Sequence, residues 1–333
     1  MGTFAGLAAA RQWLGEQYGV DVHNSGLWRL PPVTVIASSY VHPTTTKAVG
    51  MLGFGRESVH VLADNDTGEM DINRLRQALD RAADSPVIVI LTAGDVDTGR
   101  FDPIREVTVA CRSRNAWVHV DGAFGLFARV SPSRRYLADG VELAQSVSVD
   151  AHKWLNVPFD SGLVYVRDIR YLESAFATTA AFLDDPGLTL MDRCPENSRR
   201  ARGIAIWASL MAYGRSGFQE LVDRHLCLAN RLGRQVKGAP DFELMAPVSL
   251  NVVAFRWKPE DLPESEVDTL NQDIAKILLE DGQIFVGSLA RINGRVGFRA
   301  IILNWRTREE DIDNIIPRVR AAGLIHRNRK TSF

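Results

Sequence analysis

Short apolar or β-branched runs alternate with stretches of helical spacing through the first half of the chain. Turn-forming Asn, Asp and Gly residues separate several of these segments. Strands are predicted at residues 33–38, 59–63, 87–91, 117–120, 146–149 and 163–166, and helices at residues 3–18, 43–52, 72–83 and 104–114. This alternation favours an α/β fold, in which a mainly parallel sheet is covered by helices on both faces.

The pattern changes in the second half of the chain. Two helical stretches come first, at residues 202–213 and 217–236. Strands at 251–257 and 296–303 and helices at 265–280 and 307–322 then suggest a smaller α+β domain. Gly238-Ala239-Pro240 marks the predicted boundary. We therefore expect a large domain with connecting helices at 1–237 and a small C-terminal domain at 238–333.

The predicted parallel sheet directs attention to residues that follow its strands. Ligands of such sheets bind beyond the carboxyl ends of the strands. The residues at these positions are His42, Gly94-Asp95, Asp121 and His152-Lys153. A binding site is therefore expected among them.

Composition and charge narrow the possible functions. Hydrophobic residues make up 46% of the chain and charged residues 24%, which is typical of a globular protein in water. The net charge of −1 suggests neither a nucleic acid nor an anionic membrane as partner. The chain lacks an uncharged run long enough to span a bilayer. Three cysteines without CxxC spacing argue against a disulfide framework or a metal site, and a cytoplasmic location is expected.

Asp121 and Lys153 carry the candidate chemistry. A lysine at a strand end can serve as an amine nucleophile, and a carboxylate nearby can pair with a cationic ring nitrogen. Pyridoxal phosphate (PLP) needs these two groups from its protein. On spacing alone, a helix-capping aspartate and a surface lysine are the more frequent explanation of these residues. The Asp…His-Lys arrangement is also shared by several families of PLP enzymes, including other lyases.

Two longer segments resemble a known family. Residues 117–125, which include Asp121, and residues 150–162, which include Lys153, are similar to the two signatures of group II PLP-dependent amino-acid decarboxylases. That family includes aromatic-amino-acid and glutamate decarboxylases. The resemblance extends from residue 1 to residues 304–311. It implies PLP as cofactor and the PLP-dependent transferase fold type I.

The resemblance assigns roles to individual residues. Lys153 resembles the lysine that forms the internal aldimine, and Asp121 the partner of the pyridine nitrogen. His152 is similar to the residue beside the lysine that touches the phosphate. Ala123 corresponds to a small residue against one ring face, and His42 to the histidine stacked on the other. Without the resemblance, His42 would more often be a turn or cap residue.

The start of the chain departs from the family pattern. Residues 1–11 match the helix that follows the family's phosphate-binding turn, and the family has a substantial segment before it. That segment normally contributes to the phosphate site, the dimer and the substrate pocket. Only Gly2 and Thr3 remain near the phosphate position, where helical N–H groups would bind the anion. The chain therefore resembles an N-terminally truncated member.

Two further departures concern single residues. Phe182 stands where the decarboxylases carry a loop tyrosine, the proposed acid for the substrate's Cα, and a phenylalanine has no proton to donate. In related aldehyde synthases, a phenylalanine there accompanies oxidative decarboxylation and deamination; loop drift is the simpler explanation. Asp95 stands where the family commonly has a neutral residue near the cofactor. An added carboxylate there would repel the phosphate unless it points into solvent.

These observations predict PLP-dependent decarboxylation of an L-amino acid, performed by a homodimer. One alternative is a catalytically impaired, truncated member or an assembly partner of a complete homologue. Another is oxidative decarboxylation and deamination to an aldehyde, motivated by Phe182. The identity of the amino acid does not follow from the sequence.

Overall fold

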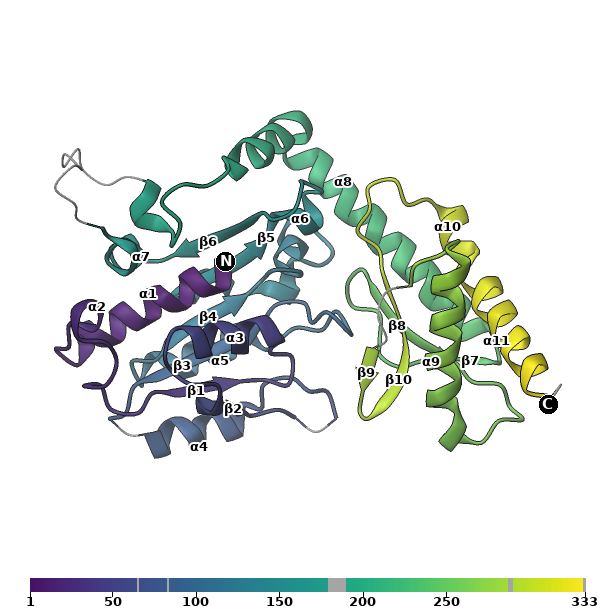
Figure 1. The fold of residues 1–333 in the computed structure, drawn as a ribbon, viewed down its shortest axis with the longest axis horizontal. Helices are drawn as coiled ribbons and strands as arrows, with labels where there is room; N and C mark the ends of the chain where they lie inside the picture. Colours follow the sequence, from purple (N-terminus) through teal and green to yellow (C-terminus); the bar gives the residue numbers. More distant parts are fainter. Residues whose placement is uncertain (65, 83, 179–189, 287–289, 332–333) are drawn as a thin grey trace. The chain divides into compact units, whose positions relative to one another are not determined.

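The chain folds into two compact units. The computed structural model describes residues 1–64, 66–82, 84–178, 190–286 and 290–331 (Figure 1). The first unit contains Met1–Gly94, Phe101–Arg129 and Arg135–Ala212. The second contains Asp95–Arg100, Val130–Arg134 and Tyr213–Phe333.

A six-stranded, mainly parallel sheet forms the centre of the first unit. Its strands are β1 (Thr34–Ala37), β2 (Val59–Val61), β3 (Val87–Thr92), β4 (Trp117–Asp121), β5 (Ser146–Asp150) and β6 (Gly162–Val166), in the spatial order β2-β1-β3-β4-β5-β6. Only the β5–β6 pair is antiparallel among the described pairs of this sheet. β3 and β4 are buried along their whole length, as expected for strands covered on both faces. The predicted α/β fold is confirmed.

The first unit also contains helices, several of which pack apolar side chains against the sheet. They are α1 (Gly2–Gln17), α2 (Val22–Ser25), α3 (Pro43–Met51), α4 (Ile72–Ala82), α5 (Ile104–Arg112), α6 (Ala151–Trp154) and α7 (Ile169–Phe176). Leu7 and Leu14 of α1 share one buried cluster with Val35, Ile88 and Trp117 of the sheet. α4 and α5 contact each other, and α5 contacts β4. Short 3-10 turns lie at Arg56–Ser58, Leu126–Val130, Arg135–Ala138, Val141–Leu143 and Leu190–Arg193.

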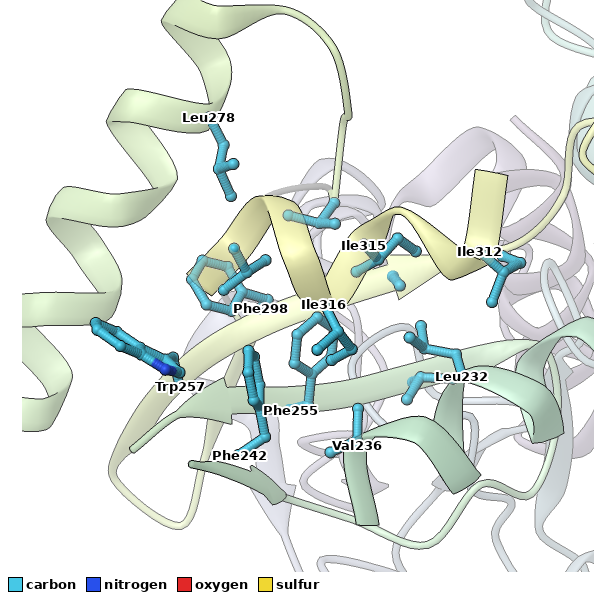
Figure 2. Packing of buried hydrophobic residues seen from close by; sticks show 14 of the residues in the cluster. Leu232, Val236, Phe242, Phe255, Trp257, Leu278, Phe298, Ile312, Ile315 and Ile316 are labelled. Carbon is cyan, nitrogen blue, oxygen red and sulfur yellow. The ribbon is translucent and has the colours of Figure 1, made fainter. Parts of the chain in front are cut away.

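The second unit is an antiparallel sheet packed against helices. Its strands are β7 (Phe242–Leu244), β8 (Val252–Trp257), β9 (Ala290–Ile292) and β10 (Arg295–Ile301), in the order β7-β8-β10-β9. α8 (Arg202–Gly238) enters this unit, followed by α9 (Glu264–Asp281), α10 (Glu309–Asp313) and α11 (Ile315–Thr331). Phe255 and Phe298, on adjacent strands, have ring centroids 5.5 Å apart at the centre of its core (Figure 2).

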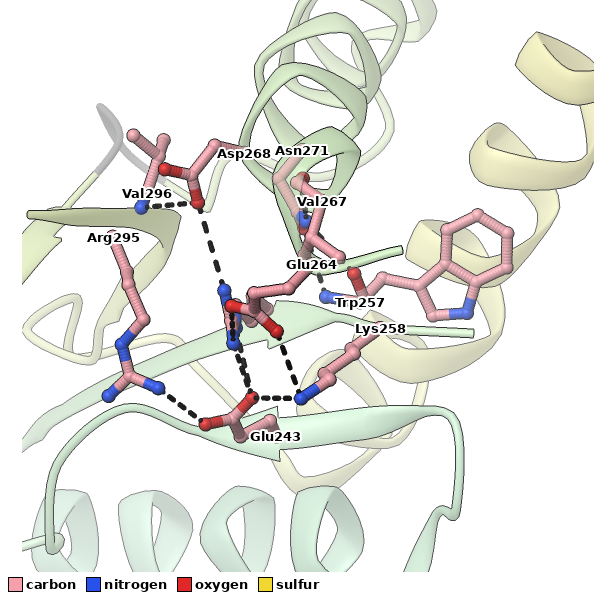
Figure 3. A network of polar contacts seen from close by, with 10 residues as sticks. Glu243, Trp257, Lys258, Glu264, Val267, Asp268, Asn271, Arg295 and Val296 are labelled. Atoms are coloured by element: carbon pink, nitrogen blue, oxygen red, sulfur yellow. Dashed lines mark hydrogen bonds and ion pairs between the residues drawn. The ribbon is translucent and has the colours of Figure 1, made fainter. Parts of the chain in front are cut away.

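A buried arginine organises the polar side of the second unit. The side chain of Arg256 in β8 is 1% exposed and contacts Glu243 at 2.7 Å and Glu264 at 2.6 Å. Figure 3 shows Glu243 and Glu264 in this network. Burial of the Glu243 carboxyl opposes its ionisation, but hydrogen bonds from Arg256 and the charges of Arg256, Arg295 and Lys258 together lower its pKa. The guanidinium therefore joins β7, β8 and α9 without leaving a buried charge unpaired.

The compact units differ from the predicted domains in the placement of residues 95–100, 130–134 and 213–237, which group with the C-terminal strands. Leu228, Leu232 and Val236 of α8 belong to the same core cluster as Phe255. α8 itself is interrupted at Gly214, whose φ of 58° is left-handed and non-helical. The predicted helix at 307–322 is also two helices, because α10 ends at Asp313 before α11 begins.

Candidate functional site

The ends of two neighbouring strands carry Asp121 and Lys153. β4 ends at Asp121, which is paired with Ser148 of the parallel strand β5. β5 ends at Asp150, and Lys153 follows in the single-turn helix α6. The segments at the ends of β4 and β5 also contact each other, since the Asp150 N–H donates to the Ala123 carbonyl at 3.4 Å. The structure therefore brings the predicted acid and amine to the same edge of the sheet.

Asp121 is a buried carboxylate surrounded by hydrogen-bond donors. The Ala123 N–H donates to Oδ1 at 3.1 Å, and the Thr45 hydroxyl donates to Oδ2 at 3.2 Å. The Ser148 hydroxyl lies 3.5 Å from Oδ1. Donors of this kind fix the orientation of the carboxylate, which can pair with a cationic ring nitrogen.

Lys153 is partly accessible to solvent. Its Nζ lies 3.2 Å from Oδ2 of Asp150, and the two side chains are 28% and 30% exposed. Nζ also lies 5.6 Å from the centroid of the Phe124 ring. The amine is thus held between a carboxylate and an aromatic face while remaining accessible to a ligand.

His152 is fixed by the turn that follows it. Its Nδ1 lies 2.6 Å from the Ser161 carbonyl, and its ring centroid lies 4.3 Å from that of Phe159. Nε2 is 3.7 Å from Oδ2 of Asp150. The ring is therefore oriented by backbone, an aromatic contact and the carboxylate that also holds Lys153.

The N-terminus of α1 reaches the same edge of the sheet. Thr3 Oγ1 lies 3.0 Å from Ser148 Oγ. A Cβ at Gly2 would lie 2.7 Å from the Leu163 carbonyl, so this helix start requires glycine. Met1 caps the helix without a side-chain hydrogen bond, which leaves the first-turn N–H groups available to an anion.

His42 is placed at the beginning of α3. Its Nδ1 accepts a hydrogen bond from the Thr44 N–H at 3.2 Å, so the residue acts as the N-cap. The ring is exposed. Thr45, three residues later, is the residue that bonds Asp121. α3 therefore connects His42 to the site, and stacking on a cofactor ring stays a prediction.

Asp95 and Phe182 are the remaining predicted site residues. Asp95 belongs to the second unit, and its carboxylate accepts the N–H and the hydroxyl of Thr98, both at 2.8 Å, within its own turn. Burial raises the pKa of this carboxyl. The role of Asp95 at a cofactor stays a prediction. Phe182 lies outside the described residues.

Three residues of the site were not predicted from the sequence. Thr45, Ser148 and Asp150 contact Asp121 or Lys153 through side chains. Ser148 and Asp150 could have been predicted from their position, because they lie on the strand that leads to Lys153. A polar residue at alternate positions of a buried strand needs a partner, and here the partner is the site.

These groups fit PLP by their chemistry. An accessible amine, a buried and well-bonded carboxylate, and a helix N-terminus with free donors correspond to its aldehyde, its pyridine nitrogen and its phosphate. No helix among the described residues combines the length and apolar character needed to cross a membrane.

Comparison with known proteins agrees with this chemistry. The family described as the pyridoxal-dependent decarboxylase conserved domain matches residues 4–258. Aromatic-L-amino-acid decarboxylase of Bacillus atrophaeus is 26% identical over 331 residues, which are 96% of this chain and 66% of the relative. L-2,4-diaminobutyrate decarboxylase of Rhizobium meliloti (strain 1021) is 30% identical over 317 residues, which are 90% of this chain and 60% of that protein.

A solved structure shows the same architecture. The crystal structure of Oryza sativa TDC with PLP and tryptamine superimposes with a TM-score of 0.88 at 25% identity, covering 98% of this chain and 68% of that one. The chain spans 66% and 60% of the lengths of the two curated relatives above. The sheet is that of PLP-dependent fold type I, and the family's cofactor is PLP. This chain belongs to the pyridoxal-dependent decarboxylase family.

Proposed function

We propose that this chain binds PLP through Lys153 and decarboxylates an L-amino acid. The observation that carries the proposal is the placement of Asp121 and Lys153 on adjoining ends of β4 and β5, in a chain of this family. Relatives act on substrates as different as aromatic amino acids and 2,4-diaminobutyrate, so the proposal names no particular side chain.

Each group has a defined task in this proposal. Bound PLP supplies an electron sink for the pair of electrons that carbon dioxide leaves behind. Lys153 would hold the cofactor through its amine, the nucleophile that an aldehyde group requires. Asp121 would accept a hydrogen bond from the protonated ring nitrogen. Thr3, the first turn of α1 and His152 would hold the phosphate, while Ala123 and His42 would contact the two ring faces.

Cofactor binding is tested by absorbance and mass spectrometry. Purified protein titrated with PLP should gain a visible band, and borohydride reduction should leave a pyridoxyl group on the peptide that contains Lys153. Lys153→Ala should lose both signals. Lys276→Ala is the matched control, since that side chain is 72% exposed on α9. A band and a label that survive in Lys153→Ala would contradict the proposal.

The reaction is tested by its products. Amine and carbon dioxide in equal amounts, from one member of a panel of L-amino acids, are expected. Phe182 supports oxidative deamination as a second candidate, in which hydrogen peroxide, ammonia and aldehyde appear with carbon dioxide. PLP binding without turnover of any substrate would instead favour an impaired member or an assembly partner.

We further propose that the protein is a cytoplasmic homodimer. Ile204, Trp207 and Met211 of α8 recur at helical spacing, and their side chains are 65%, 63% and 69% exposed. An exposed apolar stripe of this kind is typical of a protein–protein interface. The cytoplasmic location is supported by the three cysteines, which are free.

A further inference from the structure

We propose that His119 is a positioning residue for Asp121, acting through a directed chain of hydrogen bonds that starts at Trp117 and ends at the carboxylate. The proposal rests on the PLP-binding function above, because its consequence is a stronger interaction of Asp121 with the cofactor's ring nitrogen. His119 itself touches neither cofactor nor substrate in this proposal.

The chain of contacts runs through the interior of the first unit. Trp117 Nε1 lies 2.9 Å from Ser146 Oγ, and that oxygen lies 2.8 Å from His119 Nδ1. On the other side of the ring, His119 Nε2 lies 3.3 Å from Ser148 Oγ, which is 3.5 Å from Asp121 Oδ1. All five residues lie on the adjacent strands β4 and β5.

The direction of the chain follows from its two ends. An ionised carboxylate can only accept, so Ser148 gives its one proton to Asp121 and accepts from His119 Nε2. The single N–H of the neutral imidazole then lies on Nε2, so Nδ1 accepts the proton of Ser146. The indole N–H of Trp117 can only donate, and Ser146 Oγ accepts from it.

Burial supports the neutral imidazole on which this direction depends. His119 is fully buried, and burial lowers its pKa to about 4 although Asp121 opposes the change. Gly6 of α1 packs directly on the ring, because a Cβ there would lie 2.8 Å from Cε1. The ring is thus held by packing and by a serine at each nitrogen.

The chain completes the donor set around Asp121. Thr3 Oγ1, 3.0 Å from Ser148 Oγ, can supply Ser148 with a second donor, so that the serine proton remains directed at the carboxylate. With Thr45 and the Ala123 N–H, Asp121 then has three donors, which hold its carboxylate in one orientation. Successive hydrogen bonds in a low-dielectric interior polarise one another.

The test compares PLP with its 1-deaza analogue, which has carbon in place of the pyridine nitrogen. Dissociation constants are measured by absorbance titration for the wild type, Ser148→Ala, His119→Asn and Asp121→Asn. Because the chain acts through Asp121, Ser148→Ala should weaken PLP binding roughly three- to tenfold and leave the analogue unchanged. Asp121→Asn should show a larger effect with the same selectivity. The double variant of His119 and Ser148 should lose little more than either single variant.

Controls separate a positioning role from a structural one. Ser174→Ala, on the exposed surface of α7, is the matched control and should bind both ligands as the wild type does. Urea unfolding of the ligand-free variants reports folding, and Ser148→Ala carries the test if His119→Asn does not fold.

Each outcome decides between defined alternatives. Equal losses for PLP and the analogue in Ser148→Ala, or no loss for either, would overturn the positioning role. If Asp121→Asn discriminates between the ligands and Ser148→Ala does not, this inference alone fails. Failure of the wild type to bind PLP would overturn the proposed function as well.

Discussion

At the scale of single residues, the buried carboxyl of Asp102 connects several segments of the first unit by hydrogen bonds. Asp102 is 2% exposed and accepts hydrogen bonds from the Ser38 hydroxyl at 2.9 Å and from the Met70 and Thr92 N–H groups at 2.8 and 2.7 Å. It therefore connects three segments that are distant in sequence, two of which adjoin the ends of β1 and β3. Burial raises its pKa to about 7 despite these donors.

This raised pKa predicts a pH dependence of folding stability. The folded state retains a proton on Asp102 that the unfolded chain loses near pH 4, so its contribution is complete below about pH 4 and is lost as the pH rises to about 7. Asp102→Asn, which cannot titrate, should be less stable than the wild type at pH 5, because its amide cannot accept from all three donors. The difference in unfolding free energy between the wild type and Asp102→Asn should decrease by at most about 1.4 kcal/mol per pH unit up to pH 7. Urea unfolding at pH 5 to 8 measures this difference. If the unfolding free energies of the two proteins change in parallel with pH, Asp102 does not titrate as proposed.

The residues of the site differ in how far the sequence revealed them. Lys153 and Asp121 lie in segments that resemble family signatures, and their strand-end positions were predictable from hydrophobic patterning. The roles of Thr45 and Asp102 depend on hydrogen bonds to residues 76 and 64 positions away, which no local pattern encodes. The hydrogen bonds of the Asp95 carboxylate to Thr98, three residues further on, likewise did not follow from its strand-end position.

At the scale of elements, length determined what could be predicted. The six strands of the parallel sheet and the helices α1, α3, α4 and α5 were predicted because several periodic positions define each. α2, α6 and α7 have four to eight residues, and β7 and β9 have three, so their periodicity is too short to recognise. Tertiary contacts determine these elements. β2 is equally short, but it lies in the longer run 59–63, from which it was predicted.

The close packing of α1 on β4 yields a prediction for two helical glycines. In Gly6→Ala the new Cβ would meet the His119 ring at 2.8 Å, and that ring is fixed by hydrogen bonds at both nitrogens. Overpacking of this kind should cost about 1–3 kcal/mol of unfolding free energy. Gly203→Ala in α8, where nothing lies within 4 Å of the added Cβ, should instead be neutral or stabilising by up to about 1 kcal/mol. If Gly6→Ala and Gly203→Ala change the unfolding free energy equally in urea unfolding, contact with His119 does not restrict the residue at position 6, in α1.

At the scale of the whole molecule, the predicted boundary and the compact units assign the C-terminal part of α8 differently. Residues 217–236 read from sequence as a connecting helix. In the structure, Leu228, Leu232 and Val236 lie in the core of the second unit, while the N-terminal part of α8 belongs to the first. A helical period shows that one face is apolar, but it does not show which partner covers that face.

The exposed face of the first part of α8 yields the last prediction. Ile204, Trp207 and Met211 are more than 60% exposed, although a helix in a single folded chain normally buries such a stripe. If a second copy covers it, Trp207→Glu combined with Met211→Glu should weaken dimerisation at least roughly thirtyfold, because aromatic anchors carry most of the binding energy of an interface. Val109→Glu on α5, where an isolated apolar side chain is 52% exposed, is the matched control and should remain dimeric. Sedimentation velocity over a concentration series gives the dissociation constants. A wild type that is monomeric throughout the series, or a double variant that dimerises as tightly as the control, would show that this face does not form the dimer.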